Sequence, residues 1–465
     1  RMLPLGPWAR SYTPGNVTST ITRVDLARRD ADRDAAPPVP QLLLALQIDR
    51  PTARPTRQLL VELDEVRFGR GDAAPARVGR VLHLRVPDPR MSSDHGRLVR
   101  HADGWRLEDR ASKNGCVVNG QHTRDALVHH GDLLELGHTF FRFRVAPAGD
   151  ATADDPEDAA GGVPALATFD HELATRFARL RSVAGTPVPV LLLGETGTGK
   201  EVIAQAFHAL AGRPGPFVGV NCGALPETLV EAELFGARKG AFSGAIADRP
   251  GLVRSADGGT LFLDEIAELR PESQAALLRA LQEREVTPIG DTRPVKVDVR
   301  VCAATHRALD DLVAAGKFRR DLYARLAGFT LPLPPLRARI DDLGLLVRAL
   351  LLRLPGGAAA QLTPAAARRL FVYAWPHNVR ELEQVLAQAI ALAGARPIDV
   401  DDLGELTAPA AEPRDRDASL QHTLTALLTE HHGNIAAVAR VFGKDRMQIH
   451  RWVRRFGIDL TQFRR

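Results

Sequence analysis

The feature that most constrains the fold is a glycine-rich stretch in the middle of the chain, residues 190–201, with the sequence VLLLGETGTGKE. The apolar residues before Gly194 predict a buried strand, the glycines predict a tight turn, and residues 201–210 predict a helix. Because glycine has no Cβ, backbone N–H groups of such a turn can close around a polyphosphate, and the helix start adds its dipole. The pattern predicts an α/β domain with these nucleotide-binding residues: Gly194, Glu195, Thr196, Gly197, Thr198, Gly199, Lys200 and Glu201.

A second apolar run, residues 259–263, ends in two carboxylates, Asp264 and Glu265. This is the Walker B arrangement, and it predicts that Asp264 binds Mg²⁺ directly or through water. Glu265 is then the group that polarises the attacking water. Glu201 stands where most phosphate loops carry a Ser or Thr hydroxyl for magnesium, so Asp264 is the predicted metal ligand.

The length and composition of the chain limit its class. At 465 residues it is too long for one hydrophobic core, which predicts about two to four domains. No apolar run approaches the ~18 residues of a membrane span and no signal-peptide pattern leads the sequence, so we expect no membrane partner. The three cysteines lack metal-ligand spacing, which favours a reduced, cytoplasmic protein.

Changes of composition along the chain predict a multidomain fold: an all-β sandwich, an α/β domain with a helical lid, and an all-α domain at the end. The β-rich part has short apolar runs separated by Gly, Pro, Asn and Asp, as in a sandwich. The linkers are rich in Ala, Pro and acidic residues. The predicted segments are a flexible arm (1–40), the β-rich domain (41–146), an acidic linker (147–165), the α/β subdomain (166–335), the lid (336–406), a second linker (407–418) and the basic helical domain (419–465).

The β-rich domain carries a recognisable set of loop residues. Phe68-Gly69-Arg70 is followed by a Ser92-Ser93-Asp94-His95 loop, and then by two Asn-Gly pairs at 114–115 and 119–120. This resembles a forkhead-associated (FHA) domain, whose members bind phosphothreonine peptides. The resemblance implies that Arg70 and Ser92 hold the phosphate, that Asn114 holds the peptide backbone, and that His95 and Asn119 hold the loops together. A guanidinium fork and a hydroxyl suit a dianionic phosphate. The alternative is a sandwich used only for packing.

Between the two nucleotide motifs lies a run with the sequence GAFSGA, residues 240–245. With GETGTGKE, ELFG and GGTLFLDEI, it resembles the central AAA+ domain of bacterial enhancer-binding proteins, the activators of sigma-54 RNA polymerase. That family's phosphate loop also ends in GKE, and its GAFTGA loop contacts sigma-54. The resemblance implies a sigma-54 contact by these residues: Gly240, Ala241, Phe242, Ser243, Gly244 and Ala245.

The same resemblance assigns roles to five further residues. Asn221 aligns with the residue that holds Glu265 inactive until the ring is engaged, and Thr305 with a γ-phosphate sensor. Arg380 is the sensor residue of the lid. Arg319 and Arg325 match the arginine fingers, which complete the site of a neighbouring subunit and therefore imply a ring.

Two histidines depart from the family pattern. His306 stands in place of the usual Asn after Thr305, and His377 in place of a Gly in WPGNVREL. If that glycine needs a positive φ, His377 is expected to stiffen the lid hinge.

The last residues of the chain are basic, with eight Lys or Arg side chains against two Asp from Asn434 to Arg465, which suggests a nucleic-acid partner. The pattern of residues 433–455 resembles a Fis-type helix-turn-helix. It implies base contacts by Arg446, Gln448 and Arg451, and phosphate contacts by Lys444, Arg454 and Arg455.

Together these resemblances imply a sigma-54-dependent transcriptional activator that hydrolyses ATP with Mg²⁺. The implied partners are sigma-54 RNA polymerase, double-stranded DNA upstream of the promoter, a phosphothreonine protein or Ser/Thr kinase, and further copies of the chain in a ring, a hexamer by family analogy. Phosphothreonine binding is hypothesised to shift ring assembly.

Three alternatives stay open at this point. The chain could be a DNA-binding regulator that uses ATP only to control its assembly. Ser243 and His306, which depart from the family pattern, leave this alternative open. It could be an AAA+ remodeller of another target, with a tail that binds protein. The FHA domain could also repress the motor instead of activating it.

Overall fold

The computed structural model describes residues 38–147, 155–226, 229–241 and 246–406, and parts of the chain between 424 and 463. The predicted residues Phe242, Ser243, Gly244, Ala245 and Lys444 lie outside the described residues, as do the side chains of Arg454 and Arg455. None of the described helices combines the length and apolar character needed to cross a membrane.

The first domain is a sandwich of two six-stranded sheets, with strand orders β2-β1-β12-β11-β8-β9 and β10-β7-β6-β3-β5-β4. Successive side chains of a strand point to opposite faces of the sheet, so every second residue is buried in the core, as in Val81–Val86. The strands are β1 (Pro38–Gln47), β2 (Thr56–Leu59), β3 (Glu65–Arg70), β4 (Ala76–Val78), β5 (Val81–Val86), β6 (Gly96–His101), β7 (Gly104–Asp109), β8 (Cys116–Val118), β9 (Gln121–Thr123), β10 (Asp125–Val128), β11 (Leu133–Leu136) and β12 (Thr139–Pro147).

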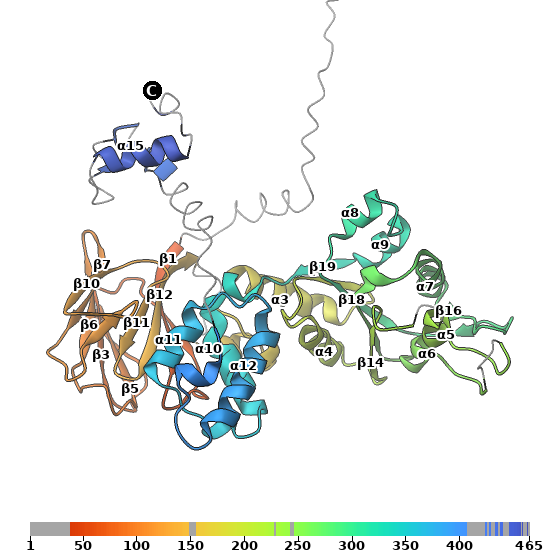
Figure 1. Cartoon of the computed structure of the whole chain (residues 1–465), viewed down its shortest axis with the longest axis horizontal. Helices are drawn as coiled ribbons and strands as arrows, with labels where there is room; N and C mark the ends of the chain where they lie inside the picture. Colours follow the sequence, from red (N-terminus) through yellow and green to blue (C-terminus); the bar gives the residue numbers. More distant parts are fainter. Residues whose placement is uncertain are drawn as a thin grey trace, which may run out of the picture.

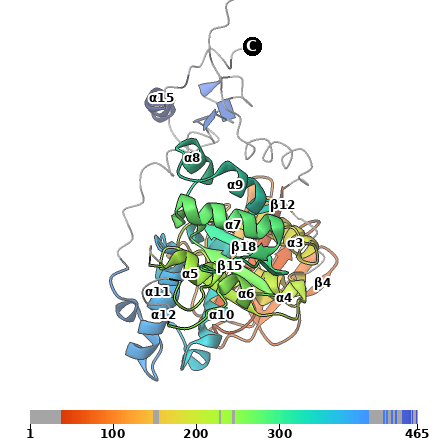
Figure 2. The ribbon, with the colours of Figure 1, turned by 90° about the vertical axis from the view of Figure 1, so that its right-hand side faces the viewer.

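The α/β subdomain is built on a parallel sheet of order β14-β15-β18-β13-β19, surrounded by helices (Figure 2). Every residue of β18 is buried, because helices cover both faces of a parallel sheet. Leu191 and Ala303 enter the core on one face, and Leu192 and Ala304 enter the core on the other. Its strands are β13 (Val190–Leu193), β14 (Phe217–Asn221), β15 (Thr260–Asp264), β18 (Arg300–Thr305) and β19 (Phe329–Pro332), with a hairpin of β16 (Glu285–Val286) and β17 (Val295–Lys296).

Helices complete the α/β subdomain and form the lid. Those of the α/β subdomain are α3 (His171–Ala184), α4 (Lys200–Ala211), α5 (Val230–Phe235), α6 (Leu252–Ser255), α7 (Pro271–Glu283), α8 (Leu309–Ala314) and α9 (Arg320–Leu326). The lid consists of α10 (Leu343–Arg353), α11 (Pro364–Val372) and α12 (Asn378–Ala393), with short 3₁₀ turns between them.

The sandwich packs directly on the lid, beside α10 and α11 (Figure 1). Leu46, Ile48 and Phe140 belong to the same buried apolar cluster as the lid helices, and the ring of Phe140 stacks on that of Phe371 at 6.1 Å. A Cβ at Gly344 would overlap the backbone carbonyl oxygen of Ala45. The two parts therefore share one core.

Part of the predicted acidic linker is ordered. Asp155 caps a short helix, α2 (Pro156–Ala159), by accepting from the Glu157 N–H. Asp155, Glu157 and Asp158 all form ion pairs with Arg54 of the sandwich, and Glu157 also pairs with Arg348 of the lid. The composition predicts a flexible tether, but these acidic side chains face arginines distant in sequence.

The described residues near the end of the chain form a small apolar cluster of their own. Leu424, Leu428 and Val438 are buried together with Ile449 and Val453 of α15 (Arg446–Arg455).

Replacing Gly344 by Ala tests the shared core. The added methyl must displace the Ala45 carbonyl, and overpacking of this kind costs about 1–3 kcal/mol, more than the gain in helix propensity of about 1 kcal/mol. We expect the variant to unfold at a lower temperature in calorimetry. Gly185→Ala is the matched control, since a Cβ there meets no atom within 4 Å. Equal melting of the two variants would contradict the shared core.

Candidate active site

The phosphate loop follows the end of β13 and closes at the start of α4. Gly197 and Gly199 have φ angles of 80° and 99°, which only glycine adopts without strain. The Lys200 ammonium is folded back on the loop, where it donates to the carbonyl oxygens of Gly194 at 2.9 Å and Glu195 at 3.2 Å. Burial lowers the pKa of Lys200, and the nearby charge of Arg380 lowers it further. These bonds hold the lysine at the place where phosphate oxygens can replace the carbonyls.

The two predicted carboxylates lie at the same edge of the sheet as the phosphate loop. In the strand registers Leu193 is opposite Thr305, and Asn221 is opposite Asp264. Since the strands are parallel, their carboxyl ends meet at one edge, where α/β proteins bind ligands. The structure therefore brings Lys200, Asp264 and Thr305 together, as the sequence predicts.

Asp264 fits a divalent cation. Burial raises the pKa of Asp264, and repulsion from Glu265 and Glu201 raises it further. A carboxylate oxygen is the kind of ligand that Mg²⁺ prefers, and a cation at Asp264 would relieve this repulsion. Asp264 would hold the ion, which would neutralise charge on the phosphates.

Glu265 is held by a contact that sequence reasoning missed. Its backbone has φ 49°, a strained value for a residue with a side chain. Its carboxylate lies 2.7 Å from Nδ1 of His306, while the Asn221 side-chain oxygen accepts from the Gly223 N–H at 2.9 Å. In this structure His306, and not Asn221, is therefore the hydrogen-bond partner of Glu265. The departure from Asn at position 306 is the sequence signal that could have pointed to it.

The lid contacts the phosphate loop through the start of α12. The N–H groups of Val379 and Arg380 donate to the Gly197 carbonyl at 2.9 and 3.3 Å. The Asn378 amide donates to Glu195 and to the Thr196 carbonyl, both at 3.1 Å. Arg380 thus lies beside the phosphate loop, where the sequence places it.

His377 does not strain the lid hinge. Its φ is −104°, so the expected cost of a positive φ does not arise. The positive φ angles of this segment fall on Trp375 and Asn378. Asn tolerates this conformation better than most residues do.

Two arginines at the start of the lid, which the sequence did not single out, also hold the loop. Arg337 forms a bidentate pair with Glu195 at 2.8 and 2.5 Å and is the main cause of the lowered pKa of Glu195. The buried Arg339 donates to the Thr198 carbonyl at 3.0 Å. Burial raises the pKa of the adjacent Asp342 carboxyl to about 6, although that group accepts from Thr168 and from the Phe169 N–H.

The two predicted arginine fingers are exposed on and next to α9. Arg319 pairs with Asp321 at 2.8 Å, and Arg325 donates to the Leu281 carbonyl at 3.0 Å. Among the described residues, neither forms a hydrogen bond or ion pair with the phosphate loop or with Asp264 and Glu265.

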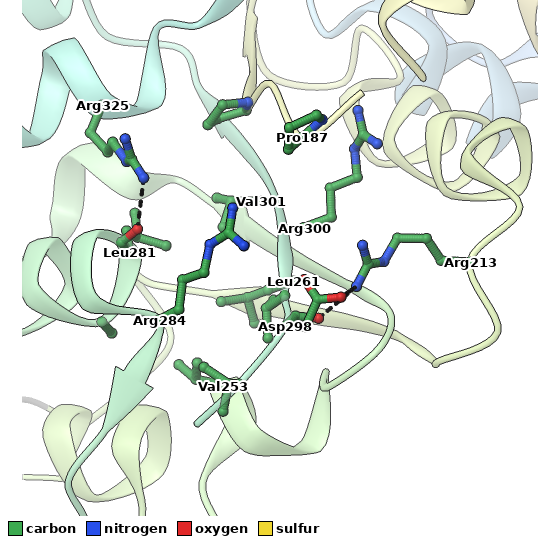
Figure 3. A pocket seen from close by; sticks show the side chains of 14 residues that line it. Pro187, Arg213, Val253, Leu261, Leu281, Arg284, Asp298, Arg300, Val301 and Arg325 are labelled. Carbon is green, nitrogen blue, oxygen red and sulfur yellow. Dashed lines mark hydrogen bonds and ion pairs between the residues drawn. The ribbon is translucent and has the colours of Figure 1, made fainter. Parts of the chain in front are cut away.

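A cavity of about 70 Å³ beside Arg325 lies at the opposite, amino-terminal edge of the sheet (Figure 3). Two of the arginines that line it, Arg300 and Arg213, stabilise the fold. Arg300 donates to the carbonyls of Ala184 and Val183 that end α3, and its guanidinium lies over the Phe207 ring at 4.4 Å. Arg213 pairs with Asp298 at 2.7 Å. This cavity is not the nucleotide site.

The described residues on the two sides of GAFSGA are bonded to each other. Ala237 pairs with Arg249 across the loop, and Arg238 bonds both Asp248 at 2.6 Å and Asp291 at 2.7 Å. Gly240 has a φ of 81°, and it is followed by Ala241 at the edge of the described part.

The predicted phosphopeptide residues lie on loops of the sandwich. Arg70 ends β3 and is exposed, and the Ser92 hydroxyl accepts from the Lys113 N–H at 3.2 Å. The Asn114 amide donates to the Arg90 carbonyl at 2.6 Å. Arg70 thus stands at the end of a strand, while Ser92 and Asn114 stand on the loops at 87–95 and 110–115, which these bonds join.

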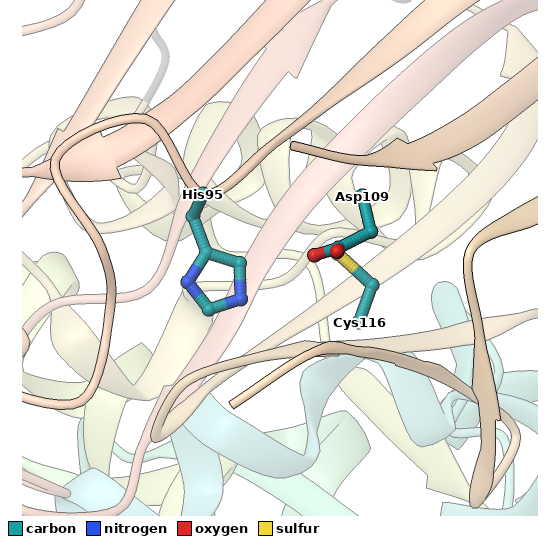
Figure 4. A group of neighbouring side chains, drawn as sticks. All are labelled: His95, Asp109 and Cys116. Carbon is teal, nitrogen blue, oxygen red and sulfur yellow. The ribbon is translucent and has the colours of Figure 1, made fainter. Parts of the chain in front are cut away.

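His95 holds these loops together and is not a metal ligand. It lies near Asp109 and Cys116 (Figure 4). However, its Nδ1 accepts from the Ser92 N–H at 3.0 Å, so its Nε2 carries the proton and donates to the Gly115 carbonyl at 3.0 Å. Burial raises the pKa of the Cys116 thiol, which keeps it protonated. The second predicted loop holder, Asn119, donates to Asp132 at 2.7 Å and accepts from the Leu133 N–H at 2.9 Å.

The predicted DNA contacts that the structure describes lie on α15. Arg446 and Arg451 are exposed, while Ile449 and Val453 face the apolar cluster. Among its described side chains the helix is therefore amphipathic, with Arg446 and Arg451 on the exposed face.

Replacing Gly197 by Ala tests how tightly the lid and the phosphate loop fit. A Cβ there would overlap the His377 carbonyl, in addition to the cost of the positive φ. We expect about tenfold weaker binding of a fluorescent ATP analogue, which corresponds to about 1.4 kcal/mol. Gly212→Ala has a comparable φ of 60° with no atom within 4 Å of the Cβ, and should bind normally. Equal affinities would exclude the contact.

Three family models match the chain. Residues 166–332 match the Sigma-54 interaction domain, residues 337–420 match the AAA+ ATPase lid domain, and residues 66–137 match the FHA domain. These matches confirm the predicted sandwich, α/β subdomain and lid.

Similar proteins include the Acetoin catabolism regulatory protein of Cupriavidus necator, 43% identical over 357 residues, which span 72% of this chain and 52% of that protein. The Transcriptional regulatory protein GlrR of Escherichia coli is 41% identical over 298 residues, or 61% of this chain and 66% of that protein. The crystal structure of NtrX from Brucella abortus in complex with ATP is 30% identical, with a TM-score of 0.47, over 63% of this chain and 69% of that one. The chain spans between half and two thirds of these two curated relatives. It combines an FHA domain with a sigma-54 interaction domain and an AAA+ ATPase lid.

Proposed function

We propose that this chain is an ATP-hydrolysing activator of sigma-54 RNA polymerase that takes a phosphothreonine signal through its FHA domain. The observation that carries the proposal is the gathering of Lys200, Asp264 and Glu265 at one sheet edge, within the segment that matches a Sigma-54 interaction domain. The GAFSGA loop belongs to the same segment.

The chemistry follows from the positions of these groups. The phosphate loop and Lys200 bind the polyphosphate of ATP, and Asp264 would hold Mg²⁺, which would neutralise charge on the phosphates. Glu265 positions the attacking water once it is free of His306, and Thr305 and Arg380 sense the γ-phosphate. Arg319 and Arg325 act on the nucleotide of a neighbouring subunit, so the active form is a ring, a hexamer by family analogy.

ATP hydrolysis in this ring drives the work on polymerase. The ion pairs of Arg238 with Asp248 and Asp291 connect residues 240–245 to the α/β subdomain. A conformational change of the subdomain can therefore move these residues, which contact sigma-54. The basic helix α15 holds the ring on double-stranded DNA upstream of the promoter, with Arg446, Gln448 and Arg451 at the bases and Lys444, Arg454 and Arg455 at the phosphates. The parts of this activator are the sandwich (41–146), the α/β subdomain (166–335), the lid (336–406) and the basic helical domain (419–465).

One observation favours a passive regulator as the second candidate. The carboxylate of Glu265 is hydrogen-bonded to His306 and so does not position a water molecule. In this arrangement the chain could bind ATP without hydrolysing it rapidly. ATP would then control assembly alone. Promoter opening separates the two candidates, since a passive regulator leaves the closed complex unchanged.

Glu265→Ala tests the motor. The variant should bind ATP with unchanged affinity but lose at least about 100-fold in hydrolysis, because general-base and positioning effects contribute about 10²–10⁴-fold. Promoter melting by sigma-54 polymerase should be lost in parallel. Glu268→Ala is the control, since Glu268 pairs with Arg307 at 2.7 Å outside the site. Hydrolysis that survives in Glu265→Ala would overturn the assigned role.

Arg451→Ala tests the DNA-binding role of α15. The exposed Arg451 is proposed to contact a base edge, so its loss should weaken specific binding by about 1–3 kcal/mol. The wild-type protein should release DNA as salt rises, since phosphate contacts displace counterions. Both are measured by fluorescence anisotropy with a labelled duplex. Salt-independent binding, or none by the wild type, would instead support a tail that binds protein.

A further inference from the structure

A polar cleft of about 200 Å³ lies where the sandwich meets lid helix α11. Residues of both parts line it, among them Asn114, His122 and Glu135 from the sandwich and Pro364 and Arg368 from the lid. The turn between β8 and β9 reaches the same lid side chain, because a Cβ at Gly120 would lie 3.8 Å from Cδ of Arg368. The cleft therefore exists only when the sandwich and the lid are docked.

The docking is strong enough to define this cleft. Besides the shared apolar core, Asp341 at the start of the lid receives bonds from Arg142 at 2.8 Å and Arg144 at 3.1 Å. The Leu362 N–H donates to the Ile48 carbonyl at 3.0 Å. Contacts made by the residues before α10 and by the residues after it thus fix the lid against the sandwich.

The charges of the cleft favour an anion. Arg368 uses Nε to bond both carboxylate oxygens of Glu135, at 2.7 and 2.9 Å. The structure gives its terminal nitrogens no bond to a described residue. Burial raises the pKa of Glu135, and Arg368 opposes that rise. Arg90 also lines the cleft, and Glu135, the carboxylate on the lining, is already paired with Arg368. The other acidic groups nearby, Asp49 and Asp88, are bonded to His138.

The cleft continues from the predicted phosphopeptide site. Asn114, the residue expected to hold the backbone of a bound peptide, is itself part of the lining. It is bonded to the carbonyl of Arg90, two residues before Ser92. A peptide whose phosphate lies at Arg70 and Ser92 and whose backbone reaches Asn114 is directed to the cleft by the same loop.

We propose that a segment flanking the phosphothreonine binds in this cleft, and that the lid residue Arg368 selects an acidic side chain on the peptide. The inference rests on the proposed phosphothreonine binding by the FHA domain. The partner is thus a protein with a phosphothreonine and a nearby Asp or Glu, and it is recognised by the sandwich and the lid together.

The test uses the full chain and synthetic phosphothreonine peptides with alanine on both sides. One Asp is moved through each flanking position in turn, and affinity is measured by fluorescence anisotropy. We expect Asp at one or two positions to strengthen binding about five- to tenfold, and Lys at the same positions to weaken it. This comparison needs no protein variant, so a folding defect cannot obscure it.

Variants then assign the effect to Arg368. Arg368→Ala should bind the Asp peptide no more tightly than the all-alanine peptide, so that the gain from Asp is lost. Because this change leaves the buried Glu135 unpaired, the double variant Arg368→Ala with Glu135→Gln is measured too and should behave alike. Arg369→Ala, on the same helix but outside the cleft, is the matched control and should keep the full gain.

The outcomes separate this inference from the function on which it rests. If no phosphothreonine peptide binds, or if Arg70→Ala binds as well as wild type, phosphopeptide recognition by the FHA domain fails and the cleft proposal fails with it. If phosphopeptides bind through Arg70 but no flanking Asp helps, or the gain survives in both Arg368 variants, the cleft proposal alone is overturned.

Discussion

The contact on which the rest of the structure depends is the docking of the start of α12 on the phosphate loop. Two backbone N–H groups of this helix end donate to the Gly197 carbonyl, and Asn378 bonds two neighbouring loop residues. The first turn of a helix has N–H groups without partners inside the helix, so a carbonyl of the loop satisfies them. The absence of a side chain at Gly197 permits the approach. The same helix packs in the apolar core that the lid shares with the sandwich, so the lid joins the sandwich to the phosphate loop.

Local pattern was enough to predict the elements that carry the nucleotide chemistry. Glycine spacing, apolar strands and a carboxylate pair are each encoded within a few residues, and the structure places Lys200, Asp264 and Thr305 at one edge. That edge follows from a rule about parallel strands, which needs no knowledge of their order. The sandwich was predictable for a similar reason, because its strands alternate between buried and exposed residues.

What could not be predicted depends on pairs of residues far apart in sequence. The bond between His306 and Glu265 forms because β18 lies beside β15 in the sheet. The order of the strands in a sheet cannot be predicted from the sequence of either strand alone. The sandwich–lid contact joins Ala45 to Gly344, and nothing in an ordinary helix glycine reveals its partner. The acidic linker illustrates the same limit in its charges. The composition of this linker favours disorder. In the folded chain, however, Glu157 forms ion pairs with Arg54 of the sandwich and Arg348 of the lid.

The placement of the lid between two ligand sites has a thermodynamic consequence. If one ligand changes the affinity of the chain for the other, the second ligand must change the affinity for the first by the same factor. If nucleotide shifts the lid against the sandwich and changes peptide affinity tenfold, the peptide changes nucleotide affinity by the same tenfold, or about 1.4 kcal/mol. The affinity of the protein for a phosphorylated partner would then depend on how much ATP the cell contains relative to ADP.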